Sequence, residues 1–283
     1  MALFKKRKKE SVAIPFLVSM IITLFIIGIP ILKYYNNIIE KKTEKESTAS
    51  QTVFTPTEDN DTTLLFTFTP DDQTLRDSFM LLRTSALEKS FMFIPVSNDM
   101  LCGSQKMSEI FDKGGIIDLK KAIEQSLEIK IDRYMALDTQ SITLIWDSIG
   151  GVNYPVPDGL KGLNEGTQFL DSTFLIKLIS NKKFTEEART VTIGSVFSEL
   201  MANASGTRVA DIFDITYNSL VNMAETDITS IDYDNQKKAI EYILRSNQFK
   251  SAFRVPGGNA TENGINMTKD AIEQLKSETG LKN

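Results

Sequence analysis

The 283-residue chain contains no histidine and a single cysteine, Cys102. Without histidine, the chain cannot build a Ser-His-Asp triad, a Cys-His pair or a histidine-ligated zinc site. One cysteine excludes an intramolecular disulfide, so the fold depends on its hydrophobic core, and we expect Cys102 to be chemically inert. Any bound metal ion would therefore be a hard cation with oxygen ligands, such as magnesium or calcium.

Proline is also scarce, with eight residues, while 41% of the chain is hydrophobic and 24% is charged. This composition is typical of one globular domain of about 200 to 240 residues with a sizeable core, plus an appendage. The appendage is N-terminal, where residues 12–32 contain no charged side chain. At about 1.5 Å per residue, a helix over this run would span the roughly 30 Å hydrocarbon core of a membrane.

Five basic residues, 5–9, precede this apolar run, and no small-residue cleavage site follows it. Basic residues next to a membrane helix favour the cytoplasmic side. We therefore predict a cytoplasmic basic tail over 1–11 and a transmembrane signal anchor over 12–32. The protein would cross the cell membrane once, with its C-terminal domain outside the cytoplasm. The alternative is a buried core helix preceded by a basic cluster of the nuclear type.

The net charge differs between the two parts of the chain. The whole chain carries −5 and residues 1–11 carry +4, so residues 12–283 carry −9. An acidic domain repels the phosphates of nucleic acids. We therefore exclude nucleic acid as a partner.

Residues 33–61 are polar and threonine-rich, which predicts a flexible stalk ahead of a folded extracytoplasmic domain over 62–283. Within that domain, segments with strand-like patterns alternate with segments of helical periodicity. This alternation predicts an α/β fold with a mixed central sheet and helices on both sides. The expected strands are 62–69, 78–83, 90–95, 132–138 and 249–258, and the expected helices are 104–115, 116–127, 141–149, 170–180, 186–204, 208–224, 234–246 and 267–280.

The segment Trp146–Pro157, WDSIGGVNYPVP, carries the most specific pattern of the chain. It predicts a helix end, a turn at Gly150 and Gly151, and a strand, because paired glycines supply the positive φ angles that such a turn needs. We expect Asp147 to be structural. The segment resembles a signature of the LytR-CpsA-Psr family, whose members attach polymers to the bacterial cell wall.

The resemblance extends over roughly 64–202 and more loosely over the rest of the chain. It implies the three-layer α/β fold of that family and a substrate with a polyprenyl-linked pyrophosphate. It also implies arginines that clamp the phosphates and a magnesium ion on acidic residues. This division is physically sensible, because arginine forks match phosphate oxygens and a cation neutralises charge on the leaving group.

Five residues follow from the family motifs as candidate site residues. Asp77 lies where the motif Arg-Ser-Asp has its aspartate, which implies a catalytic and magnesium-binding role. Asp72 lies close to the place of a second metal-site aspartate and could substitute for it. Lys106 and Arg189 match a lysine and an arginine that bind phosphate, and Lys182 offers a further positive charge.

Other arginine positions of these motifs are empty: Leu75, Val96 and Thr192 stand at three of them, and no arginine occurs in the segment LIKLISNKKF. Each lost clamp in such a site costs on the order of 3 kcal/mol, or a hundredfold in rate. Little catalysis would remain unless Lys182, Lys183, Arg76 or Arg83 compensated. The sequence therefore favours a protein whose transfer activity is weakened or lost.

Three hypotheses follow. The first is a membrane-anchored binding module of the cell envelope that holds a polyprenyl-phosphate- or pyrophosphate-linked glycopolymer, a lipid, peptidoglycan or an envelope protein. The alternative is an active magnesium-dependent phosphotransferase that attaches glycopolymers to peptidoglycan. An unrelated membrane-tethered sensor domain is the third. In the first two, SFMLL and SFMFI would line an apolar cleft between sheet and helices for a lipid tail.

Overall fold

The computed structural model of the protein describes residues 54–72, 75–156, 166–180, 184–204, 207–246 and 248–282. The predicted tail over 1–11, the anchor over 12–32 and the stalk up to residue 53 lie outside them. Within the described part of the chain, no helix has the length and apolar character needed to cross a membrane. The membrane anchor therefore stays a prediction from the sequence.

The centre of the domain is a six-stranded sheet in the order β10-β3-β2-β1-β6-β9. It is mixed, because β1 is antiparallel to β2 but parallel to β6, and β3 is parallel to β10. This confirms the predicted fold class and its main strands. The strands of this sheet are β1 (Thr62–Phe68), β2 (Ser78–Ser85), β3 (Ser90–Val96), β6 (Arg133–Leu137), β9 (Glu225–Thr226) and β10 (Lys250–Phe253).

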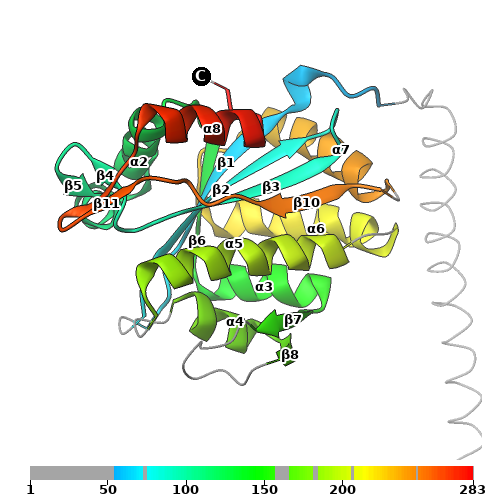
Figure 1. Cartoon of the computed structure of the whole chain (residues 1–283). Coiled ribbons are helices and arrows are strands. Elements are labelled where there is room, and N and C mark those ends of the chain that lie inside the picture. The colour runs from blue at the N-terminus through cyan, green and yellow to red at the C-terminus, as the bar shows by residue number, and fades with distance from the viewer. Residues whose placement is uncertain are drawn as a thin grey trace, which may run out of the picture. The chain divides into compact units, whose positions relative to one another are not determined.

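Helices cover both faces of this sheet, with α2 and α8 on one side and α3 and α5 on the other (Figure 1). Further out, α6 packs between α3 and α7, and α4 contacts α3 and α5. The helices are α2 (Met107–Leu127), α3 (Thr139–Ile149), α4 (Ser172–Ile179), α5 (Glu186–Asn203), α6 (Thr207–Met223), α7 (Ser230–Leu244) and α8 (Lys269–Thr279).

The central strands are apolar on both faces because both faces are covered. Along β1, Leu65 belongs to the core beneath α2, while Phe66 and Phe68 point to the opposite side, toward α3 and α5. The period of two in side-chain direction thus divides one strand between two apolar layers. The layer beneath α2 holds a cluster of buried apolar side chains, and the layer beneath α5 contains the cavity described below.

The helix α2 has a break that the sequence predicted as a boundary between two helices at Gly114 and Gly115. Gly115 has φ 65° and ψ −160°, which is not helical. The element α2 thus consists of two helical segments that meet at a kink at this residue, as the sequence predicted. A side chain at these angles would be strained, so glycine allows the chain to bend here without a loop.

The segment 146–157 forms the predicted helix end, turn and strand. Gly150 caps α3 with φ 95°, and Gly151 follows with φ 74°. The next residues form β7 (Val152–Val156), which pairs with β8 (Gly166–Leu170). The buried Trp146 donates from Nε1 to the carbonyl oxygen of Leu170 at 2.8 Å, which ties the helix to this hairpin.

Part of the predicted stalk belongs to the folded domain. Residues Glu58–Asn60 form a short 3-10 helix, η1, closed by a capping box with Thr57. Asp61 then pairs with Arg83 at 2.7 Å, and the Arg83 side chain is only 6% exposed. The folded part therefore begins a few residues before the predicted boundary at 62.

Candidate functional site

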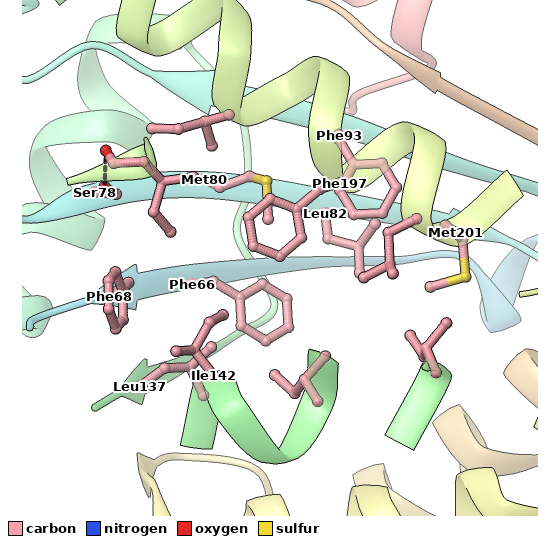
Figure 2. Close-up of a pocket in the computed structure, with 15 residues that line it drawn as sticks. Phe66, Phe68, Ser78, Met80, Leu82, Phe93, Leu137, Ile142, Phe197 and Met201 are labelled. Atoms are coloured by element: carbon pink, nitrogen blue, oxygen red, sulfur yellow. Dashed lines mark hydrogen bonds between the residues drawn. The ribbon is translucent and has the colours of Figure 1, made fainter. Parts of the chain in front are cut away.

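An apolar cavity lies between the sheet and the helices α3 and α5. Figure 2 shows it as an elongated space, with Ser78 at one end and Met201 at the other. Among the described residues that line it, Ser78 is the one polar side chain. The lining residues are Phe66, Phe68, Ser78, Met80, Leu82, Phe93, Leu137, Ile142, Ile145, Ile149, Ile179, Ile193, Phe197, Leu200 and Met201. This lining is that of a site for an apolar ligand.

The strand β2 supplies the wall that the sequence predicted, since Met80 and Leu82 from SFMLL line the cavity. From SFMFI in β3, Phe93 lines it, whereas Ile94 belongs to the core beneath α2. The cleft predicted between sheet and helices is therefore present.

The guanidinium of Arg189 lies behind the Ser78 end of the cavity and is 1% exposed. Its Nη1 donates to the Ser78 hydroxyl and to the Asp77 carbonyl oxygen, both at 2.9 Å, and to the Ile179 carbonyl oxygen at 3.1 Å. Its Nε and Nη2 donate to Glu186 at 2.9 to 3.1 Å. All three nitrogen atoms of the guanidinium thus have protein acceptors.

Glu186, at the start of α5, accepts hydrogen bonds from several polar groups near the Ser78 end of the cavity. Its carboxylate accepts hydrogen bonds from the Asn98 backbone N–H at 2.8 Å and from the Ser97 hydroxyl at 3.4 Å. Arg76 donates from Nη1 to the same carboxylate at 3.2 Å. The Glu186 side chain is 9% exposed and that of Arg76 is 36% exposed. Two arginines therefore share one carboxylate.

Asp77 and Arg189 are brought together as the motifs implied, but through the backbone of Asp77. Its carbonyl oxygen accepts from Arg189 and, at 3.1 Å, from the Asn98 side-chain amide. Asp72 lies in the exposed turn that precedes β2. Among the described residues, no three acidic or cysteine side chains gather closely enough to hold a metal ion. Magnesium binding by Asp77 and Asp72 stays a prediction from the sequence.

Lys106 lies at the N-terminal end of α2 and pairs with Asp99 at 2.8 Å. The Asp99 carboxylate raises the pKa of the Lys106 ammonium group, with a further contribution from Glu186. Lys106 is therefore fully charged at neutral pH and close enough to Glu186 for the two charges to attract each other. Lys182 lies outside the described residues.

Arg83, which the sequence offered as a compensating cation, lies at the other end of β2 and pairs with Asp61 and Glu88. Arg76, the other arginine that the sequence offered as a compensating cation, does reach the site. The sequence also passed over Glu186. Its spacing was the available signal, because a carboxylate three residues before Arg189 on a helix can pair with it.

Glu186 also lines a more polar groove next to the start of α5. Ser97, Asp99 and Glu187 contribute polar groups to it, and the hairpin of β11 (Asn259–Thr261) and β12 (Gly264–Asn266) forms part of its wall. Arg189 thus links the Glu186 carboxylate in this groove to Ser78 at the polar end of the apolar cavity.

A mixed sheet covered by helices on both faces is an α/β architecture that this chain shares with solved bacterial proteins. The model of the LytR-CpsA-Psr family matches residues 31–280, and the chain belongs to this family. No curated protein matches the chain.

Among solved structures, a transcription regulator from Eubacterium siraeum DSM 15702 has a TM-score of 0.70 at 21% identity, over 82% of this chain and 96% of that one. TagV of B. subtilis has a TM-score of 0.57 at 16% identity, over 77% and 95%. TagT bound to LIIa-WTA has a TM-score of 0.59 at 15% identity, over 77% and 89%. These likenesses confirm the fold.

Proposed function

We propose that the protein is a membrane-anchored, extracytoplasmic member of the family that binds a polyprenyl-linked glycopolymer in cell-wall biogenesis. The lipid tail would occupy the apolar cavity from Ser78 to Met201, and the glycan would extend outside it. The cavity is the observation that carries this proposal. The membership of this chain in the family and the ligand in the TagT structure support a glycopolymer as the partner.

Transfer activity is weak or absent in this proposal, because the charges at the polar end are already balanced. The one motif arginine near the cavity, Arg189, is buried, and each of its nitrogens already donates to a protein acceptor, so its charge is not available to stabilise developing charge on a phosphate. Stabilising such charge is usually the largest single contribution to catalysis.

An active phosphotransferase is the second candidate. The proximity of Arg189 to Asp77 favours it, as does the groove beside Glu186, which would receive the acceptor. This candidate predicts release of undecaprenyl phosphate from an undecaprenyl-pyrophosphate glycan in the presence of magnesium. Loss of that release in Asp77→Ala would support it.

The binding proposal is tested by mass spectrometry of lipid retained by the detergent-extracted, full-length protein. We expect a polyprenyl lipid in the native protein and its loss in Ile145→Trp, which places a large ring in the cavity from a partly exposed position on α3. Ile231→Trp is the matched control, because this α7 side chain is 72% exposed and does not line the cavity. Equal lipid content in the native protein and in Ile145→Trp would contradict the proposal.

A further inference from the structure

The Glu186 carboxylate sits in a ring of donors of the kind that proteins use to hold a phosphate. The ring contains the guanidinium groups of Arg76 and Arg189, the Asn98 backbone N–H and the Ser97 hydroxyl, at 2.8 to 3.4 Å. Arginine forks and backbone amides bind carboxylates and phosphates through the same geometry. The Glu186 carboxylate therefore occupies an anion-binding site that the protein itself forms.

This site, which Glu186 occupies, lies next to the Ser78 end of the apolar cavity. Arg189 connects the two, because one of its nitrogens donates to Ser78 in the cavity wall while another donates to Glu186. A lipid whose tail lies along the cavity toward Met201 would place its head group near Ser78 (Figure 2). A phosphate there would lie beside Arg189, whose Nη1 donates to Ser78 and whose Nε and Nη2 are already bonded to Glu186, so the positive charge that it met would be balanced.

Displacement of Glu186 offers a phosphate little gain. Glu186 is held by several charge-assisted hydrogen bonds, and a phosphate in its place would make bonds of the same kind. Arg76 keeps part of its side chain exposed, but its charge is shared with Glu186.

We propose that Glu186 determines head-group specificity: it takes the place of the ligand phosphate, so the native protein binds isoprenoid lipids by the tail alone. A neutral isoprenoid alcohol is then as good a ligand as its phosphate. This inference rests on the proposed function, since it assumes that an isoprenoid tail enters the cavity.

The chain contains its own reporter for the test. Trp146 is the single tryptophan, and its ring lies 6.0 Å from that of Phe197, which lines the cavity. Titration of the full-length protein in detergent with farnesol and with farnesyl phosphate, followed by tryptophan fluorescence, gives both dissociation constants. We expect them to agree within about threefold in the native protein.

In Glu186→Ala, both guanidiniums lose their carboxylate, and we expect farnesyl phosphate to bind at least tenfold more tightly than farnesol. Glu273→Ala is the control, because it removes an exposed carboxylate on α8 that lines neither the cavity nor the groove, and it should leave the native ratio unchanged. Glu186→Gln keeps the side-chain size and should give an intermediate preference if the alanine variant does not fold.

The outcomes separate the two proposals. If the native protein prefers farnesyl phosphate by tenfold or more, Glu186 does not block the site and the inference is overturned, while lipid binding stands. If neither probe binds, the lipid function fails, and inorganic pyrophosphate still tests the anion site. Pyrophosphate should then raise the thermal midpoint of a Glu186 variant but not that of the native protein. A rise in the native protein would overturn the inference on its own.

Discussion

The buried pair of Arg189 and Glu186 gives the sharpest prediction for stability. Arg189→Met keeps most of the side-chain length and removes the charge, which leaves the Glu186 carboxylate without its main partner. Breaking a buried ion pair from one side costs about 3 to 5 kcal/mol. Glu186 would still accept from Arg76 and from the Asn98 backbone N–H, so we expect the lower end, about 3 kcal/mol.

For a domain of this size, each kcal/mol shifts the thermal midpoint by about 2 to 4 °C, so Arg189→Met should unfold about 6 to 12 °C earlier. Circular dichroism of the full-length protein in detergent measures this shift. Arg76→Met is the matched control, because it removes the other arginine on the same carboxylate from a side chain that is 36% exposed. We expect it to cost less than about 1 kcal/mol.

A double variant tests the physical reason. Glu186→Gln combined with Arg189→Met leaves no buried charge unpaired, so its cost should fall below the sum of the two single costs by about 2 kcal/mol. Additive costs would mean that the two side chains act independently. Similar small shifts for Arg189→Met and Arg76→Met would refute the burial of the Arg189 guanidinium.

Two further predictions concern other parts of the domain. Arg133 lowers the pKa of Asp232 to about 2 through a pair of hydrogen bonds, so this contribution is complete above the ordinary pKa and is lost as the pH falls through about 2. Asp232→Asn should therefore cost about 1 to 2 kcal/mol at pH 7, allowing for partial exposure, and the difference in thermal midpoint from the native protein should shrink between pH 4 and pH 2; a constant difference would contradict this. Gly280 ends α8 with φ +72°, and an added Cβ would lie 2.9 Å from the buried Arg83 guanidinium, so Gly280→Ala should cost about 2 kcal/mol. Gly150→Ala has a similar positive φ but no atom within 4 Å of the new Cβ, so it should lower the midpoint by about half as much, and equal shifts would rule out the Arg83 contact as a cause.

The main strands and helices could be predicted because each carries its own apolar pattern or cap. The segment around Trp146 is the clearest example, since the double glycine fixes the helix end and the strand that follows. The short pairs β4 (Leu101–Cys102) with β5 (Gln105–Lys106) and β11 with β12 were missed, because two- or three-residue strands have no period to detect. β9 was missed for the same reason, because its two residues are recognised as a strand only from their pairing with β6.

The candidate site was harder to predict, because the sequence shows which charges exist but not which are already paired. Arg189 kept its place in the motif, yet its burial and its bonds to Glu186 depend on β2, α4 and α5 meeting at one point. Arg76 was offered only as one of four cations that could compensate. It precedes β2, and the sequence gives no pattern from which its contact with Glu186 could be predicted.

The apolar cavity and the charged cluster differ in what a substitution there would disturb. Phe197 and Leu200 line the cavity and also pack α5 against the sheet, so a change at either position affects both ligand binding and folding. An exposed arginine that only grips a phosphate has no such second role, and its replacement by leucine or valine costs the fold little. A protein of this architecture can therefore lose its phosphate clamps while its lipid cavity persists, because stability alone requires the side chains that line the cavity. In the proposed function, tail binding and phosphate transfer are therefore separable properties, and the pairing of Arg189 with Glu186 is the structural feature that we infer to separate them.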